Sequence, residues 1–246
     1  MSQTVCIIQA RMGSTRLPGK VLKDLSGKTV LEHLIDRVKQ SKHIDEIVIA
    51  TTLSEKDNAI VSESNRCGVR HFRGSEDDVL GRYYYAAKET NADTVLRITS
   101  DCPLIDPQVI DAVVAFYHNN HYSIVTNAGN DLNQRTYPRG LDLEVFSFES
   151  LQNAFYNAKE KYQREHVTPY IYENVEDVFY FKNNIDYSRY RWTVDTEEDF
   201  ELISMVYKFL YKGRHDFYFN DILELFEKHP ELVRINEHVE QKKLKS

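Results

Sequence analysis

The chain has 246 residues, which is enough for one sizeable α/β domain. It carries 31 Lys and Arg against 38 Asp and Glu, a formal net charge of −7, and this excludes the basic composition typical of nucleic-acid binders. Hydrophobic residues make up 41% and charged residues 28%, which indicates a globular protein, not a disordered chain. Apolar runs are too short to span a membrane, and no secretory signal is visible.

The number and spacing of the cysteines indicate the cellular compartment. Cys6, Cys67 and Cys102 are odd in number and form no C-x-x-C pair, so they are expected to be reduced thiols and neither a disulfide frame nor a zinc site. We therefore expect a soluble, cytoplasmic protein without nucleic-acid or membrane partners. The sequence is compatible with a homodimer but does not predict one.

Short β-like runs alternate with amphipathic helical stretches in the first half of the chain. The pattern predicts strands at 5–10, 47–52, 69–72 and 94–99, and helices around 30–38, 56–67, 79–87 and 109–117. Gly68 suits the left-handed cap that ends the second helix. This alternation predicts βαβ units, and therefore a mostly parallel sheet flanked by helices.

The second half is less regular. It predicts a strand at 122–126, a polar loop at 127–139, and strands at 141–146 and 178–182 that are antiparallel or at an edge. Helical spacing follows at 151–158 and 200–210, and Asn220 could cap a last helix that ends before His229-Pro230. The basic tail at 241–246 is expected to fray. Without repeats or linkers, we expect one domain over 1–246 with a loop or insertion at about 127–172.

A loop rich in glycine and cations follows the first predicted strand. Residues 7–20 read IIQARMGSTRLPGK, and loops beyond the carboxyl ends of parallel strands are where ligands bind. Backbone N–H groups in such a loop can hold phosphate oxygens while Arg and Lys neutralise them. The spacing between Gly13 and Gly19, and Val21 after Lys20, exclude a Walker A loop, and no G-x-G-x-x-G is present. A solvated basic loop is the alternative, but the density of cations favours a phosphate site.

Two acidic segments could hold a metal ion. RITSDCPLID at 97–106 places Asp101 directly after a predicted strand, at the same sheet edge as the first loop, while Asp106 suits the cap of the next helix. A carboxylate facing polyphosphate makes sense with a divalent cation such as Mg²⁺ between them. RWTVDTEED at 191–199 offers Asp195, which fits either metal binding or a capping box with Glu198, and Thr196 could cap equally well. On pattern alone, the two roles of Asp195 are equally favoured.

Three further segments give weaker signals. GSEDDVLGR at 74–82 opens a helix with acidic residues, which the helix dipole alone explains. YPRGLDLE at 137–144 and REHVTPY at 164–170 mix cations, acids and aromatic residues near turns. Taken singly, each of these is more typical of a surface than of a site.

Together, these segments resemble the cytidylyltransferase family that includes CMP-Kdo synthetase and CMP-acylneuraminate synthetase, and above all its spore coat polysaccharide biosynthesis branch. The resemblance covers about residues 4–205, with the motifs in the order of that branch. It implies a nucleotidyltransferase fold, Rossmann-like and related to the glycosyltransferase A type, with a mostly parallel sheet. One departure is Ser100, which stands before Asp101 where the family usually has glycine.

The resemblance also implies roles for individual residues. Arg11, Ser14, Arg16 and Lys20 would hold the CTP triphosphate, and Asp101 and Asp195 would bind Mg²⁺. Of these, Lys20, Arg16, Asp101 and Asp195 are the expected catalytic residues. Further nucleotide contacts are expected from Ala10, Gly13, Asp78, Arg82 and Ser100. Contacts to a small anionic acceptor are expected from Arg139, Asp142, Glu144, Arg164 and His166.

The implied reaction is in-line attack of an acceptor oxygen on the α-phosphorus of CTP, with release of pyrophosphate, in surface or spore-coat polysaccharide biosynthesis. An attacking hydroxyl would need to lose its proton, to water with metal assistance or to a nearby carboxylate, whereas a phosphate acceptor needs no base. A glycosyltransferase of related fold using a nucleotide-sugar donor is an alternative, and a non-catalytic nucleotide-binding module is another. The three cations of the first loop favour a triphosphate and leaving pyrophosphate.

Overall fold

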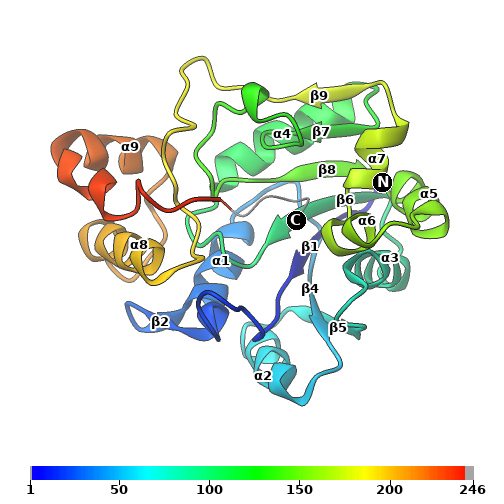
Figure 1. Ribbon diagram of the computed structural model, residues 1–246, viewed down its shortest axis with the longest axis horizontal. Helices are drawn as coiled ribbons and strands as arrows, with labels where there is room; N and C mark the ends of the chain where they lie inside the picture. Colours follow the sequence, from blue (N-terminus) through cyan, green and yellow to red (C-terminus); the bar gives the residue numbers. More distant parts are fainter. Residues whose placement is uncertain (1, 242–246) are drawn as a thin grey trace.

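A single seven-stranded sheet forms the centre of the protein (Figure 1). The computed structural model describes residues 2–241. The strand order is β5-β4-β1-β6-β8-β7-β9, and only β8 among these seven strands runs antiparallel to its neighbours. A separate two-stranded ribbon, β2-β3, follows the first loop. The sheet is therefore mostly parallel, as the alternating pattern predicts.

The strands and helices have the following bounds. The strands are β1 Thr4–Gln9, β2 Asp24–Leu25, β3 Lys28–Thr29, β4 Glu46–Thr52, β5 Arg70–Gly74, β6 Thr94–Thr99, β7 Ile124–Thr126, β8 Glu144–Ser147 and β9 Val178–Tyr180. The helices are α1 Val30–Val38, α2 Asn58–Arg66, α3 Val79–Glu89, α4 Pro107–Asn119, α5 Phe148–Asn157, α6 Lys161–His166, α7 Pro169–Asn174, α8 Glu197–Leu210 and α9 Phe219–Lys228. Short 3₁₀ segments occur at Lys20–Leu22, Glu55–Asp57, Leu132–Gln134 and Pro230–Ile235.

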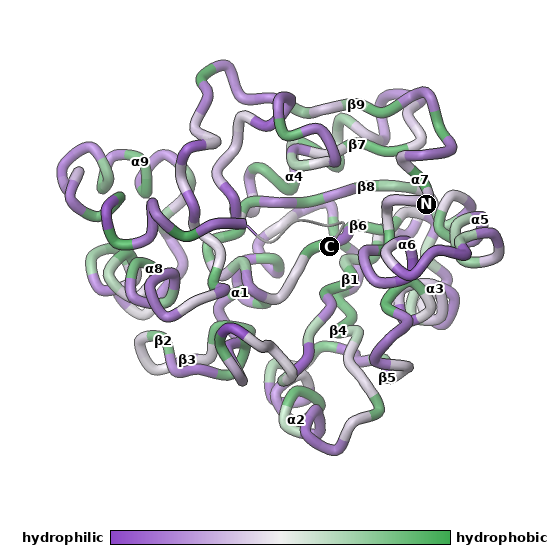
Figure 2. Tube along the Cα trace, in the orientation of Figure 1, coloured by the Kyte–Doolittle hydropathy of each residue, from purple (hydrophilic) through white to green (hydrophobic). Residues whose placement is uncertain are grey.

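Helices cover both faces of the sheet because successive strand side chains point to opposite sides. Along β1, Cys6 and Ile8 pack into the larger cluster with α1, α4, α8 and α9, whereas Val5 and Ile7 pack into a second cluster with α3, α5 and α7. Figure 2 shows the hydrophobic segments concentrated on the central strands and inner helix faces, with hydrophilic loops around them. The result is a three-layer α/β/α arrangement.

Most elements match the sequence-based prediction. Strands β1, β4, β5 and β6 and helices α1, α3, α4 and α8 lie within three residues of where the patterns place them. Asp106 caps α4 by accepting hydrogen bonds from the backbone N–H of Gln108 and Val109. Gly68 has φ +65 after α2, as its predicted role requires.

The second half contains the differences. Residues 161–174 form two short helices, α6 and α7, where the sequence suggested only turns. Helix α9 begins at Phe219 because the carboxylate of Asp221 accepts a hydrogen bond from the backbone N–H of Tyr218, so Asn220 is not the cap. The strand expected at 141–146 is shorter and starts at Glu144, and it enters the sheet between β6 and β7. Most of the tail at 241–246 lies outside the described residues.

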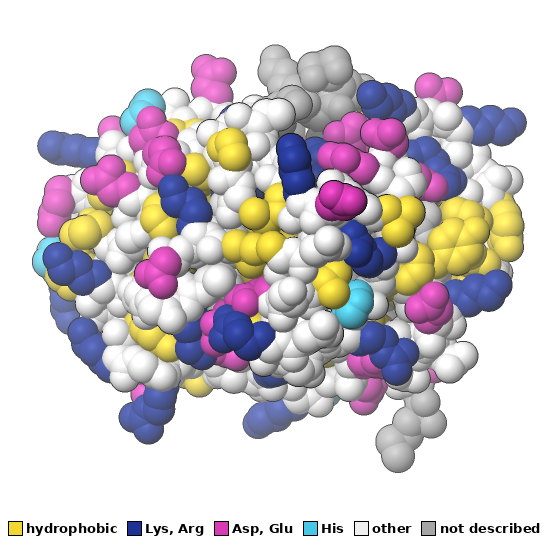
Figure 3. All heavy atoms as spheres, turned by 90° about the horizontal axis from the view of Figure 1, so that it is seen from below, with side chains coloured by type: hydrophobic (Ala, Val, Ile, Leu, Met, Phe, Trp, Pro, Cys, Tyr) yellow, Lys and Arg dark blue, Asp and Glu magenta, His cyan; other side chains and the backbone are white. Residues whose placement is uncertain are grey.

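The surface carries both signs of charge. Figure 3 shows Lys and Arg interspersed with Asp and Glu over one face, and hydrophobic atoms gathered at its right edge, the side where α3 and α5 lie in Figure 1. On these helices Tyr84 stacks on Phe155 with ring centroids 4.1 Å apart, and Tyr85 and Tyr156 are exposed. None of the helices within residues 2–241 is long and apolar enough to cross a membrane.

Candidate active site

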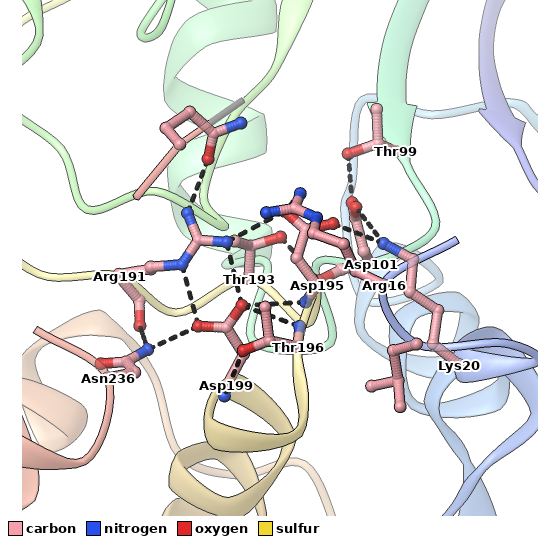
Figure 4. Close-up of polar contacts among 12 residues, drawn as sticks. Arg16, Lys20, Thr99, Asp101, Arg191, Thr193, Asp195, Thr196, Asp199 and Asn236 are labelled. Carbon is pink, nitrogen blue, oxygen red and sulfur yellow. Dashed lines mark hydrogen bonds and ion pairs between the residues drawn. The ribbon is translucent and has the colours of Figure 1, made fainter. Parts of the chain in front are cut away.

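Lys20 lies at the centre of a cluster of charged side chains at the carboxyl edge of the sheet (Figure 4). The loop after β1 turns at Gly19, whose φ of +67 favours glycine, and enters the 3₁₀ segment that begins with Lys20. The Lys20 Nζ donates to Asp101 Oδ2 at 2.8 Å and to Asp195 Oδ1 at 2.7 Å. The side chain is only 11% exposed, so one largely buried ammonium joins two carboxylates from distant parts of the chain.

The loops that carry the two carboxylates are tied to each other directly. Asp101 follows β6, and the Thr99 hydroxyl donates to its Oδ1 at 2.6 Å. The carbonyl of Asp101 accepts hydrogen bonds from the backbone N–H of Val194 at 2.8 Å and the hydroxyl of Thr193 at 3.2 Å. The separation of Asp101 and Asp195 is thus set by backbone contacts and does not depend on Lys20 alone.

Asp195 has two more cationic partners, and it does not cap the following helix. Its Oδ2 lies 2.9 Å from Arg16 Nη2 and 3.0 Å from Arg191 Nη2. The cap of α8 is Thr196, which forms a capping box with Asp199. The carboxylate of Asp195 is therefore left to the charged cluster.

Burial and charge act against each other in this cluster. Burial raises the pKa of Asp101, but the charge of Lys20 and hydrogen bonds from Lys20 and Thr99 outweigh burial and hold that pKa below its ordinary value. Burial lowers the pKa of Lys20, yet the two carboxylates outweigh it, and the net pKa is raised. Asp101 and Lys20 are therefore both ionised at neutral pH.

The donor set of the cluster fits a magnesium ion that shares its ligands with a substrate. Among residues 2–241, no group of three or more His, Cys, Asp or Glu could hold a metal by itself. Asp101 and Asp195 nevertheless converge on one cation, and Mg²⁺ in nucleotide enzymes commonly takes only one or two carboxylates plus phosphate oxygens and water. Two aspartates at this edge therefore suit Mg²⁺ with bound phosphates better than a closed protein site.

The rest of the first loop lies beside the cluster. Arg11 is exposed and pairs with Glu76 at 3.2 Å, and a Cβ added to Gly13 would lie 3.4 Å from the same carboxylate. Ala10 is buried and donates its N–H to the carbonyl of Ala50 at 3.2 Å. The Ser14 hydroxyl accepts from the N–H of Leu17 at 3.3 Å, and the N–H of buried Ser100 donates to the Gln9 carbonyl at 3.2 Å.

Asp78 and Arg82 belong to the start of α3, next to Glu76. Asp78 caps the helix, and Arg164 of α6 binds its carboxylate through Nε and Nη2 while Nη1 donates to the carbonyl of Phe155. All three nitrogens of Arg164 thus have partners within the fold. Arg82 is buried, its Nε has no partner among the described residues, and it lines a cavity of about 240 Å³ with Phe72.

Arg139 is the least committed cation near the cluster. No ion pair or side-chain hydrogen bond joins it to any residue within 2–241, whereas its neighbour Arg135 binds both carboxylate oxygens of Asp142. The backbone of Arg139 pairs with that of Arg191, so Arg139 lies close to the Asp195 loop. Burial and the charges of Arg135 and Arg191 lower the pKa of Arg139, and the carboxylate of Asp142, which Arg135 already binds, opposes this lowering only in part. An anion between these guanidinium groups would be favoured.

Glu144 and His166 are linked by a strained turn. Glu144 is buried, pairs with Arg97, and accepts hydrogen bonds from the hydroxyls of Thr168 at 3.0 Å and Tyr172 at 2.6 Å. His166 is half-buried and ends α6, and Val167 follows with φ +73 and ψ −59, a conformation that a β-branched residue rarely adopts. The N–H of Thr168 closes this turn onto the carbonyl of His166 at 2.9 Å.

Sequence reasoning missed several residues that support the cluster. Asp199 is fully buried and binds Arg191 through two hydrogen bonds, at 2.8 and 2.9 Å. Buried Asp57 accepts from the N–H of Met12 at 2.8 Å and so fixes the first loop. Arg191 lies four residues before Asp195 and Asp199 four residues after it. This spacing is the signal in the sequence that could have indicated their contact with Asp195. Nothing near Asp57 in the sequence indicates its role.

Comparisons with known proteins agree with this geometry. A family model described as cytidylyltransferase matches residues 5–231. The chain is 33% identical to the spore coat polysaccharide biosynthesis protein SpsF of Bacillus subtilis over 214 residues, covering 85% of this chain and 88% of that protein. Among solved structures, a cytidylyltransferase from Leptospira borgpetersenii aligns with a TM-score of 0.89 and 35% identity over 99% of this chain and all of that one.

A more distant likeness concerns the fold alone. A CMP-2-keto-3-deoxy-manno-octonic acid synthetase in complex with CTP aligns with a TM-score of 0.64 and 20% identity, over 84% of this chain and 99% of that one. The sequence resemblance and the nucleotidyltransferase fold expected from it are thereby confirmed. The chain belongs to the cytidylyltransferase family and is a nucleotidyltransferase.

Proposed function

We propose that this protein is a Mg²⁺-dependent enzyme that transfers CMP from CTP to a small anionic sugar or sugar-phosphate-like acceptor and releases pyrophosphate. The observation that carries the proposal is the convergence of Asp101 and Asp195 on Lys20 and Arg16. This edge offers carboxylates for a metal and cations for phosphates within one cluster. The synthetase that was solved with CTP shares the same fold.

Asp101 and Asp195 would hold the metal in this scheme. When bound there, Mg²⁺ would neutralise phosphate charge and help to orient the triphosphate for in-line attack. Lys20 and Arg16 now share the carboxylates, and in the complex they would also bind oxygens of the leaving pyrophosphate. Such catalysis rests on positioning and electrostatic stabilisation, with little covalent work for the protein.

The first loop would supply the other nucleotide contacts. Arg11 is exposed and held by a single exposed partner, so exchanging Glu76 for a phosphate costs little. Backbone and hydroxyl groups at the same edge of the sheet come from Ala10, Gly13, Ser14 and Ser100. The Nε of Arg82, which has no partner among the described residues, would donate a hydrogen bond to the nucleotide. We also propose a nucleotide contact for Asp78, which caps helix α3 in this structure.

Arg139 is the residue we propose to bind the anionic group of the acceptor. It has no internal ion pair and lies beside two other guanidinium groups, and Arg can grip a carboxylate or phosphate with two hydrogen bonds. Asp142, Glu144 and Arg164 are paired within the fold, and their contacts to the acceptor, like that of His166, remain predictions. The likeness to SpsF supports a role in polysaccharide biosynthesis. The free cysteines among the described residues suit the cytoplasm.

Calorimetry and product analysis test the proposal together. CTP should bind more tightly with Mg²⁺ than with EDTA, and pyrophosphate should appear only when CTP, Mg²⁺ and an anionic acceptor are all present. Arg139→Ala should raise the acceptor KM and leave the Kd for CTP unchanged. Release of a nucleoside diphosphate from a nucleotide sugar would show a glycosyltransferase instead, and efficient turnover of a neutral acceptor would contradict the role of Arg139.

A further inference from the structure

The carboxylate of Asp199 organises the loop that carries Asp195. Its Oδ2 accepts hydrogen bonds from the backbone N–H of Asp195 at 3.0 Å and of Thr196 at 3.2 Å. Its two oxygens also bind Nε and Nη2 of Arg191, and the same Nη2 reaches Asp195 Oδ2. Asp195 is therefore held at its backbone by Asp199 and at its carboxylate by Arg191 (Figure 4).

Asn236 holds this pair from the far side. It follows the 3₁₀ segment Pro230–Ile235, is 3% exposed, and its Nδ2 donates to the carbonyl of Arg191 at 2.9 Å and to Asp199 Oδ1 at 2.8 Å. The Oε1 of Gln241 accepts from Arg191 Nη1 at 2.6 Å. Both residues lie beyond residue 231, where the match to the cytidylyltransferase model ends.

We infer that Asn236 is a positioning residue that sets the orientation of the Asp195 carboxylate through Arg191 and Asp199. One amide nitrogen fixes the backbone of Arg191 and an oxygen of Asp199 at the same time. Without it, Arg191 and Asp199 lose the anchor that they share, and the hydrogen bond from Arg191 Nη2 to Asp195 Oδ2 is oriented less firmly. Outer residues of this kind set the geometry of metal-binding carboxylates. The inference rests on the proposed binding of Mg²⁺ and CTP.

The test is calorimetric binding of CTP, measured once with Mg²⁺ and once with EDTA. Asn236→Ala should raise the Kd for CTP in Mg²⁺ about 10-fold, the low end of the range for residues that support metal ligands. The Kd in EDTA should stay within about twofold of the wild-type value, because the cations of the first loop are untouched. Gln241→Ala removes an exposed partner of Arg191 and leaves the core intact, so it should give a smaller change in the same direction.

Thr90→Ala is the matched control for lost stability. The Thr90 hydroxyl is buried and bonds the carbonyls of Ala86 and Ala87, at the opposite edge of the sheet. The Thr90→Ala substitution should lower the melting temperature without altering the effect of Mg²⁺ on CTP binding. If Asn236→Ala behaves like this control, or weakens CTP binding equally in Mg²⁺ and EDTA, Asn236 is only structural. If wild-type protein binds CTP equally well in Mg²⁺ and EDTA, the proposed function fails and the inference fails with it.

Discussion

Replacing Lys20 by methionine tests how far the cluster depends on one buried ammonium. Methionine keeps much of the length of the lysine side chain and removes its charge. Among residues 2–241, the side-chain donors left to Asp101 are then the Thr99 hydroxyl at 2.6 Å and the more distant Cys102 thiol at 3.6 Å. Asp195 keeps Arg16 and Arg191. Removing one partner of a buried ion pair costs about 3–5 kcal/mol, and because Asp195 keeps other partners we expect a loss of about 3 kcal/mol. For a chain of this size, that corresponds to a fall in Tm of about 6–12 °C.

The assay is thermal unfolding in EDTA at neutral pH and again at about pH 3. Burial raises the pKa of Asp101, but Lys20 and its hydrogen bonds lower it below the value in the unfolded chain. The ion pair therefore stabilises the fold above the unfolded pKa of about 3.9 and is lost as the pH falls through the lower folded pKa. The gap in Tm between wild type and Lys20→Met should accordingly shrink on acidification.

Lys23→Met is the matched control for Lys20→Met. Lys23 pairs with Glu197, whose side chain is 67% exposed, and an exposed ion pair of this kind contributes only about 0–1 kcal/mol. A similar loss of Tm in the two variants would refute the reasoning. So would a gap for Lys20→Met that stays equally large in acid, because packing of the side chain would then explain the whole effect.

Two further predictions concern catalysis and backbone geometry. Asp101→Asn and Asp195→Asn should each lower Mg²⁺-dependent pyrophosphate release on the order of 100-fold or more at a temperature where the variant is still folded, although each also loses stability because Lys20 loses a carboxylate partner. A normal kcat in the folded variant would assign these residues to the fold instead. Gly140→Ala should cost about 2–4 kcal/mol in chemical unfolding, because φ is +99 and the new Cβ would lie 2.5 Å from the Trp192 backbone. Gly27→Ala, with φ +88 and open space, should cost only about 1 kcal/mol, and equal costs would rule out the steric explanation.

The sequence predicts the first half of the fold well because its signals are local. Strands β1, β4 and β6 are largely buried on both faces and therefore read as short apolar runs. Helices α1 to α4 run for nine residues or more, so their helical period is visible. Helices α6 and α7 have six residues each, too few for a helical period to stand out. The place of β8 between β6 and β7 depends on contacts between segments far apart in the chain, which no local pattern records.

In the candidate site, too, the sequence predicts some contacts and not others. The meeting of Lys20, Asp101 and the first loop follows from topology, because the carboxyl ends of parallel strands share one edge. The choice between capping and metal binding for Asp195 could not be made from the pattern, since Thr196 and Asp195 are adjacent and each has an acidic residue three positions on. Only the fold shows that Thr196 takes the cap. The role of Asn236 depends on its hydrogen bond to the carbonyl of Arg191, which brings the end of the 3₁₀ segment Pro230–Ile235 to the Asp195 loop. The sequence around Asn236 carries no signal of this contact.

The charges around the cluster explain why some cations are committed and others are not. Asp101, Asp195 and Asp199 are balanced by Lys20, Arg16 and Arg191, so the cluster is neutral by itself and is held together by its own ion pairs. A nucleoside triphosphate remains anionic after it takes up one divalent metal, and an anionic acceptor adds negative charge. The attraction for these ligands must therefore come from cations outside the balanced set. Arg11, with one exposed partner, and Arg139, with none among the described residues, are the cations that meet this need, at the proposed nucleotide and acceptor sides of the cluster.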